Sequence, residues 1–133
     1  MKSGLWAGAI AGIVAGIVGI IVVTILVATG LSEPVAGSIA RWYTSQIGFN
    51  LVWGAIFGAL YVKFQNQIPG KGILKGLVFG LLIWVIHSIY PATFYTVVAS
   101  PPWVSFAINW VSGGFIVRAL AYGSVLGALY KKE

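Results

Sequence analysis

The chain has 133 residues, of which 59% are hydrophobic and only 8% are charged, and its formal net charge is +6. Its mean hydropathy is +0.98. Soluble domains carry about 25% charged residues, so this composition excludes a soluble surface and predicts that most side chains face lipid. The basic residues stand singly at the ends of apolar runs, which argues against nucleic-acid binding. Cysteine is absent, which excludes disulfides and thiolate chemistry.

Four apolar runs are long enough to cross a bilayer, which takes about 20 residues of helix. They cover residues 5–29, 47–64, 72–89 and 111–130. Runs that are apolar on all sides indicate helices, because the strands of a membrane barrel alternate apolar and polar residues. We therefore expect an all-α, polytopic integral membrane protein with four transmembrane helices in a single domain, residues 1–133.

Lysines gather on one side of these runs, at both ends of the chain and between the second and third runs. They are Lys2, Lys63, Lys71, Lys75, Lys131 and Lys132. The positive-inside rule then predicts cytoplasmic N- and C-termini in a multi-pass protein of the inner or plasma membrane.

The connections on the other side predict where two helices begin. Ser32 and Ser100 are each followed by prolines, a pattern typical of a helix N-cap and first turn. Helices two and four are therefore expected to begin near residues 33 and 101. Pro91 is expected to kink or end the third helix, because proline removes a helix hydrogen bond.

The two halves of the chain share landmarks in the same order. Alignment places Gly72, Gly76, Gly80, Ser100, Pro102 and Trp110 on Gly4, Gly8, Gly12, Ser32, Pro34 and Trp42. With one further residue inserted, residues 127–130 (Gly-Ala-Leu-Tyr) fall on residues 58–61. We predict a duplication, with repeat 1 at residues 1–66 and repeat 2 at residues 69–133. Each repeat holds two spans, so two parallel helix pairs would be related by an axis along the bilayer normal.

Glycines at four-residue spacing form a flat ridge on a helix, which lets backbones approach closely in a membrane. The glycines predicted to pack helices together are Gly8, Gly12, Gly16, Gly54, Gly58, Gly76, Gly80, Gly123 and Gly127. The alternative for these positions is a pore lined by glycine.

Few polar side chains fall within the spans. Arg118 aligns with Asn50 before the inserted residue, and both are expected at a depth similar to that of His87. A charge in the bilayer is costly, so Arg118 should face protein or water, with Glu33, backbone carbonyls, a lipid phosphate or a bound anion as its partner. The candidate ligand or ion site is Arg118, His87, Asn50, Glu33 and Tyr90. The competing interpretation is that these residues only form hydrogen bonds between helices.

A single histidine without cysteine does not form a metal site, so no metal and no cofactor is expected. No catalytic set is apparent, and we expect that the protein is not an enzyme.

Residues 75–87, with the run Phe-Gly-Leu-Leu-Ile-Trp at 79–84 and then Pro91, resemble the YagU-like family of small prokaryotic inner-membrane proteins. The resemblance is strongest over residues 72–91 and covers about half of the chain, which lacks the family's longer, charged outer segment. It implies a multi-span inner-membrane protein and singles out Trp84, His87 and Pro91 for testing, while supplying no catalytic residue.

The function expected from the sequence is that of a non-catalytic membrane subunit. It would be a homo-oligomer or an accessory subunit of a larger membrane complex, in contact with membrane lipids and with lipid binding as a further role. The alternative is a small channel or carrier for an anion or neutral solute that uses Arg118, Asn50 and His87.

Overall fold

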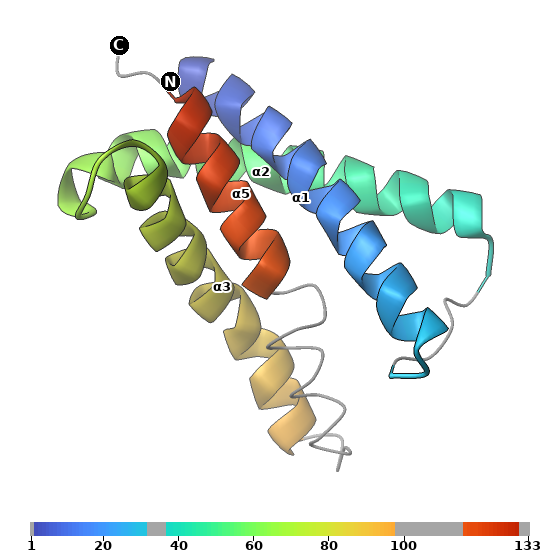
Figure 1. Cartoon of the computed structure of the whole chain (residues 1–133). Helices are drawn as coiled ribbons and strands as arrows, with labels where there is room; N and C mark the ends of the chain where they lie inside the picture. Colours follow the sequence, from blue (N-terminus) through green and yellow to red (C-terminus); the bar gives the residue numbers. More distant parts are fainter. Residues whose placement is uncertain (1, 32–36, 98–115, 131–133) are drawn as a thin grey trace.

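The computed structural model describes residues 2–31, 37–97 and 116–130 (Figure 1). These ranges contain four α-helices and one 3-10 turn, and they contain no strand. The helices are α1 (Lys2–Ala28), α2 (Ile39–Phe64), α3 (Gly72–Val97) and α5 (Ile116–Leu129), and the 3-10 turn η1 (Gln65–Gln67) follows α2 directly. The prediction of an all-α protein is confirmed for the described residues.

Two of these helices are long and apolar enough to cross a membrane. Their apolar segments are Ser3–Ala28 and Ile39–Gln67, with mean hydropathies of 3.0 and 1.5. Only 33% and 17% of their most apolar stretches are buried inside the molecule, whereas the core helix of a soluble protein is mostly buried. The apolar parts of α3 and α5, Gly72–Ile86 and Ile116–Leu129, are shorter.

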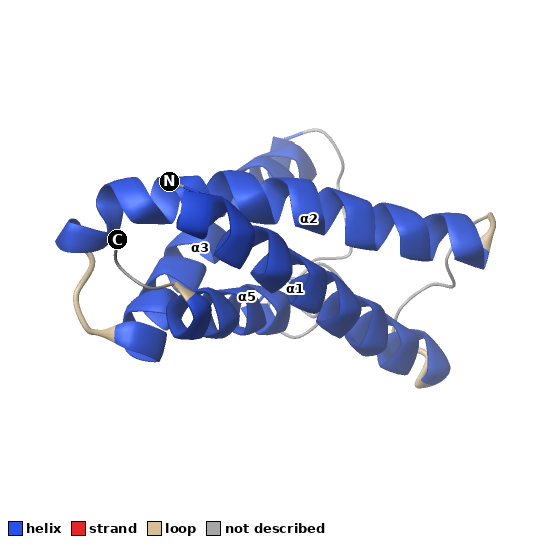
Figure 2. Cartoon of the chain, turned by 90° about the horizontal axis from the view of Figure 1, so that it is seen from above, coloured by secondary structure: helices blue, strands red, loops and turns tan. Residues whose placement is uncertain are grey.

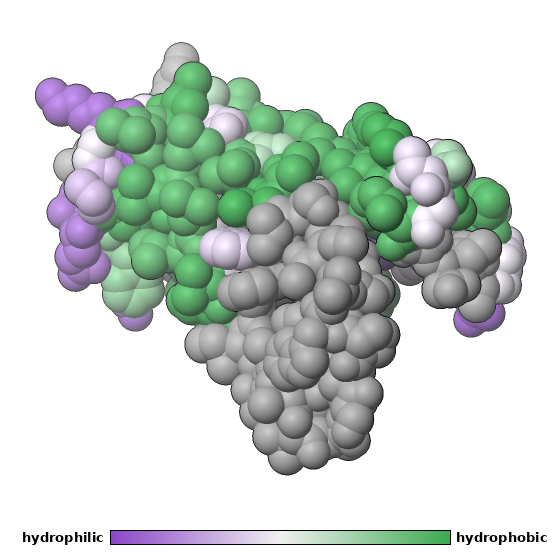
Figure 3. All heavy atoms as spheres, turned by 60° about the horizontal axis from the view of Figure 1, so that its bottom comes forward, coloured by the Kyte–Doolittle hydropathy of each residue, from purple (hydrophilic) through white to green (hydrophobic). Residues whose placement is uncertain are grey.

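Large apolar side chains lie on the outside of these helices, and in Figure 3 they cover much of the visible face, with hydrophilic residues at its two ends. The exposed residues include Ile10, Ile17, Ile21 and Ile25 on α1, Phe49, Val52, Trp53 and Ile56 on α2, and Leu81, Leu82, Val85 and Ile86 on α3. Burial of such residues against other elements normally drives folding in water. In this structure, these large apolar side chains are exposed on the outer faces of the helices.

The start of α2 differs from the prediction. Gly37 has φ +82°, a left-handed conformation that does not belong to an α-helix. Ser38 then caps α2, since its side chain accepts a hydrogen bond from the backbone N–H of Arg41 at 3.4 Å. The predicted start near residue 33 is therefore wrong, because Gly37 is not helical and Ser38 caps the helix. The predicted start of helix four near residue 101 lies outside the described residues.

Helix α3 is longer than its predicted span. It continues through Pro91 as far as Val97, so Pro91 does not end it. Proline lacks the N–H that would donate one helix hydrogen bond, but α3 includes six further residues after it. The prediction that the helix could end here is wrong.

Glycines bring the helices of each pair into backbone contact. A Cβ atom at Gly8 would collide with the carbonyl oxygen of Gly54, and one at Gly54 would collide with that of Gly8. Gly76 and Gly123 stand in the same reciprocal relation between α3 and α5. The remaining glycines that were predicted to pack, Gly12, Gly16, Gly58, Gly80 and Gly127, also lie against the partner helix of their pair. Backbones approach this closely only where no side chain intervenes.

The contacts of the two pairs follow the same register. Gly12 lies against the backbone of Asn50, and the aligned Gly80 lies against the backbone of Ala119. Ala119 therefore occupies the place that Asn50 has in the first pair, and Arg118 corresponds to Phe49. The equivalence of Arg118 with Asn50 expected from the sequence is shifted by one residue, because the inserted residue lies before position 118 in the packing.

Helix α1 packs against both α2 and α5, and α3 packs against α5 (Figures 1 and 2). The start of α1 and the end of α5 lie at the same end of the molecule (Figure 1). At this end the ring of Tyr61 meets the edges of Phe79 and Tyr130, with centroids 5.1 and 5.4 Å away. Gln65 Nε2 donates a hydrogen bond of 2.9 Å to Tyr130 Oη. These contacts join α2, α3 and α5.

Candidate functional site

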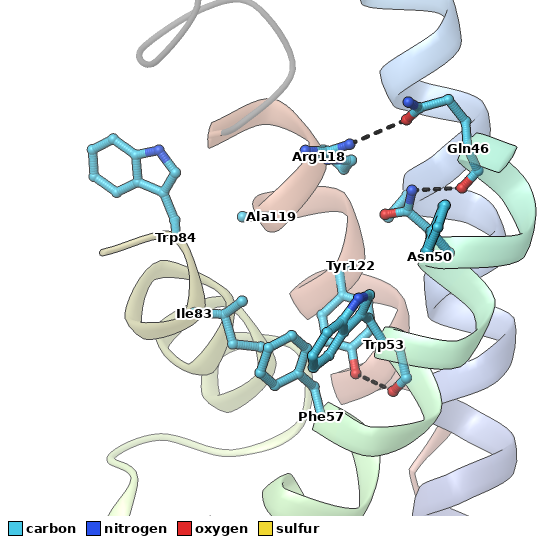
Figure 4. A pocket seen from close by; sticks show the side chains of 12 residues that line it. Gln46, Asn50, Trp53, Phe57, Ile83, Trp84, Arg118, Ala119 and Tyr122 are labelled. Atoms are coloured by element: carbon cyan, nitrogen blue, oxygen red, sulfur yellow. Dashed lines mark hydrogen bonds between the residues drawn. The ribbon is translucent and has the colours of Figure 1, made fainter. Parts of the chain in front are cut away.

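A cavity of about 260 Å³ lies among the helices (Figure 4). Helix α2 supplies half of its lining, α5 and α3 supply most of the rest, and α1 contributes one residue. The lining residues are Gln46, Phe49, Asn50, Trp53, Gly54 and Phe57 from α2, Arg118, Ala119 and Tyr122 from α5, Ile83 and Trp84 from α3, and Ala15 from α1. The walls are mainly aromatic and aliphatic, and the polar groups gather toward one end.

The two helix pairs meet through two contacts that the repeat makes equivalent, α1 with α5 and α3 with α2. The cavity exists because only the first of these contacts is close among the described residues. On α1, Ala7, Ala11 and Ala15 are buried in one core cluster with Tyr122 and Leu126 of α5. Small side chains let α1 and α5 pack closely along their length. In the alignment of the two halves, the positions of these alanines on α3 carry Lys75, Phe79 and Ile83. These side chains are larger than alanine, and within the described residues α2 and α3 pack far less closely than α1 and α5 do.

The lining uses matched positions of the two helix pairs. Phe49, Asn50 and Trp53 of α2 correspond to Arg118, Ala119 and Tyr122 of α5 in the packing register, and all six line the cavity. The cavity therefore lies between the two pairs. Its two sides differ in chemistry, because Phe49 on α2 corresponds to Arg118 on α5.

Arg118 makes the polar end of the cavity cationic. Its Nη1 donates a hydrogen bond to Gln46 Oε1 at 3.4 Å (Figure 4). This distance is long for a charged donor, whose hydrogen bonds to anions are typically about 2.7–2.9 Å. The aliphatic part of the side chain passes over Gly19, where a Cβ atom would lie 3.2 Å from Arg118 Cδ. Because Gly19 has no side chain, there is room for the Arg118 side chain to extend from α5 toward α2.

Asn50 lies one helical turn beyond Gln46 on the same face of α2. Its Nδ2 donates a hydrogen bond of 2.6 Å to the backbone oxygen of Gln46. The side-chain oxygen of Asn50 is an acceptor, and its amide carries a second N–H. Two amide side chains and one guanidinium therefore stand together at this end of the cavity.

The opposite side of the cavity is closed by Tyr122. This residue is buried, and its hydroxyl donates a hydrogen bond of 2.7 Å to the backbone oxygen of Gly54. The bond links α5 to α2 across the two helix pairs. On the α2 wall, the rings of Trp53 and Phe57 stack with centroids 5.9 Å apart and an interplanar angle of 29°. The apolar wall is thus formed by a continuous aromatic surface.

The structure brings together two of the predicted site residues, Arg118 and Asn50. His87 and Tyr90 belong to α3, and only the course of their backbone is described. Glu33 lies outside the described residues. Within those residues no group of three or more His, Cys, Asp or Glu side chains could hold a metal ion.

The sequence analysis missed Gln46 and Tyr122. Gln46 precedes Asn50 by one helical turn, and Tyr122 follows Arg118 by one turn, so both share a helix face with a predicted residue. This spacing could have identified them. The aromatic wall had no comparable signal, because Trp53 and Phe57 are two of many aromatic residues in apolar runs.

Comparison with known proteins adds no assignment: no family model, no curated protein and no solved structure matches this chain.

Proposed function

We propose that this chain is a non-catalytic integral membrane protein that crosses the bilayer four times and works as a subunit, either of a homo-oligomer or of a larger membrane complex. In this proposal, the start of α1, the connection from α2 to α3 and the end of α5 lie on the cytoplasmic side. Lipid contacts the outer faces of all four helices.

The observation that carries the proposal is the distribution of side-chain size between inside and outside. Glycine and alanine fill the helix contacts, as with Gly8 against Gly54 and with the fully buried Ala11. Large apolar residues such as Ile25 and Ile86 are more than half exposed. Water would favour the opposite arrangement, because burial of large apolar side chains is what stabilises a fold in water. In lipid that driving force between helices is absent, and close packing of small residues replaces it.

Four crossings are supported by helix length and by charge. Helix α3 has 26 residues, or about 39 Å at 1.5 Å per residue, which exceeds a hydrocarbon core of about 30 Å. For the fourth crossing, α5 is apolar from Ile116 to Leu129, and the predicted span begins at residue 111. Lys63 and Lys71 are exposed beside η1, at the end where α1 begins, as the positive-inside rule requires.

Single cysteines test the proposed topology, because the native chain has none. In cells that express Ala40→Cys or Thr96→Cys, a membrane-impermeant maleimide should label the protein directly. Asn66→Cys and Lys131→Cys should be labelled only after the membrane is permeabilised. The unlabelled native chain is the control. Labelling of Asn66→Cys in intact cells, or of Thr96→Cys only after permeabilisation, would contradict the proposal.

A second candidate, a channel or carrier for an anion or neutral solute, is favoured by one observation. The cationic group of Arg118 lies at the end of a cavity between the two helix pairs. This candidate requires flux of a small anion or neutral solute into liposomes that contain the protein, and loss of anion flux with Arg118→Gln. Liposomes that show no flux for either kind of solute would exclude it.

A further inference from the structure

We propose that the cavity between the helix pairs binds an anionic amphiphile, a phosphate or carboxylate head group with an acyl chain, which enters sideways from the bilayer between α2 and α3. The head group would lie at Arg118, and the first part of the chain would lie along Trp53, Phe57 and Ile83. This inference rests on the proposed membrane location.

The sideways entrance follows from the packing of the helices. After the contact of Tyr61 with Phe79, the described parts of α2 and α3 diverge, whereas α1 packs against α5 (Figure 1). Phe49 and Trp53 line the cavity and are also 66% and 52% exposed, so the apolar wall continues from the cavity to the outer surface. In a bilayer, this surface contacts acyl chains. An amphiphile can therefore reach the cavity without passing through water.

The polar end of the cavity is suited to an anion. Arg118 is the only charged side chain among the described residues that line it. A guanidinium is planar and presents paired N–H groups, which match the oxygens of a phosphate or carboxylate better than an ammonium does. The amides of Gln46 and Asn50 can add neutral N–H donors.

The size of the cavity limits how much of the ligand is enclosed. Its volume of about 260 Å³ falls just below the ~300–1,000 Å³ of pockets that bury a drug-sized molecule. A head group and the first carbons of one chain fit this volume, whereas a whole two-chain lipid does not. The rest of the molecule would extend through the opening between α2 and α3 into the bilayer.

The competing interpretation is that Arg118 has a structural role, in which its hydrogen bond with Gln46 links α5 to α2. The two interpretations predict different binding. A structural arginine confers no preference for anionic over zwitterionic lipid, while a head-group site does. Exposed Arg41 provides the matched control, because Arg41→Gln removes the same charge at a residue outside the cavity lining.

Native mass spectrometry of the purified full chain in a neutral detergent tests the proposal. The probes are dioctanoyl phosphatidylglycerol, dioctanoyl phosphatidylcholine and inorganic phosphate. The wild type and Arg41→Gln should bind the phosphatidylglycerol at least about tenfold more tightly than the phosphatidylcholine, and Arg118→Gln should lose this preference. Ile83→Trp keeps every charge and narrows the apolar part of the cavity. It should weaken phosphatidylglycerol binding, and Arg118→Lys should restore part of what Arg118→Gln loses.

Other outcomes would overturn the proposal. Equal binding of both lipids by the wild type, or an equal loss in Arg41→Gln and Arg118→Gln, would exclude a head-group site at Arg118. Tight binding of phosphate that competes with the lipid and is unaffected by Ile83→Trp would show a site for a free anion instead. If Arg118→Gln does not fold, unchanged affinity of Ile83→Trp for phosphatidylglycerol rejects the proposal. Each failure leaves the cysteine-labelling topology intact, so it is distinguishable from a failure of the proposed function.

Discussion

At the scale of single residues, the glycines of this protein fall into two physical classes. Gly8 lies against the backbone of α2, where even a methyl group would collide with the carbonyl oxygen of Gly54. Gly48, on the same helix as Gly54, is exposed, and no described atom lies within 4 Å of the position of its missing Cβ. The same substitution therefore has opposite consequences at the two positions.

Gly8→Ala should destabilise the protein by about 1–3 kcal/mol, because α1 and α2 must move apart to admit the methyl group. Gly48→Ala should leave stability unchanged or raise it by up to about 1 kcal/mol, because alanine favours helix over glycine. Thermal unfolding of both variants in detergent, followed by circular dichroism, measures the difference. Equal melting temperatures for the two variants would mean that the contact of Gly8 with Gly54 does not hold in the folded protein.

At the scale of helices, the decisive feature is the contrast between α1 and α3. The faces are aligned in sequence, but α1 presents Ala7, Ala11 and Ala15 where α3 presents Lys75, Phe79 and Ile83. The alanine face packs with Tyr122 and Leu126 of α5, and the bulkier face leaves the cavity beside α2. A difference in side-chain volume therefore closes one contact between the helix pairs and opens the other.

Ala11→Leu tests this role of volume. Ala11 has no exposed surface, so the added atoms should push α1 from α5 and cost about 1–3 kcal/mol of stability. Ala128→Leu makes the same change at an exposed position at the end of α5 and should cost little. Thermal unfolding and disulfide crosslinking between single cysteines on α1 and α5 measure the two effects. Retention of both stability and crosslinking in Ala11→Leu would contradict the close contact of α1 with α5.

At the scale of the whole molecule, glycine and alanine occupy the close helix contacts, a few large residues such as Tyr122 and Leu126 fill the core, and many large apolar residues lie outside. This distribution leaves apolar faces on α1, α2 and α3 that either lipid or another protein chain must cover. If the protein is a subunit, another protein chain contacts part of these apolar faces. Native mass spectrometry of the wild type should therefore show a dimer, a larger oligomer or a co-purifying subunit. A lone monomer under conditions that preserve membrane complexes would contradict the role as a subunit and leave the membrane topology unaffected.

The candidate site was only partly predictable, for reasons that differ between residues. Arg118 and Asn50 were identified because polar side chains are rare and costly in apolar helices. Gln46 was missed because it lies before the predicted second span, which begins at residue 47, whereas α2 begins at Ile39. Glu33 lies outside the described residues, and for His87 and Tyr90 only the backbone is described, so their parts in the site stay predictions, as does the resemblance to the YagU-like family.

The sequence by itself determined the all-helical character of the described residues and the apolar length of α1, because hydropathy and helix length are local properties of a chain. It also placed glycines where the helices of each pair approach, since four-residue spacing puts them on one face. Only the tertiary structure decided the end of α3 beyond Pro91 and the cavity, whereas Gly37 and Ser38 set the start of α2 through a local signal that the prediction did not use. The cavity depends on the side-chain volumes of all four helices at once. No local pattern shows that the aligned face of α1 packs closely against α5 while that of α3 does not pack closely against α2.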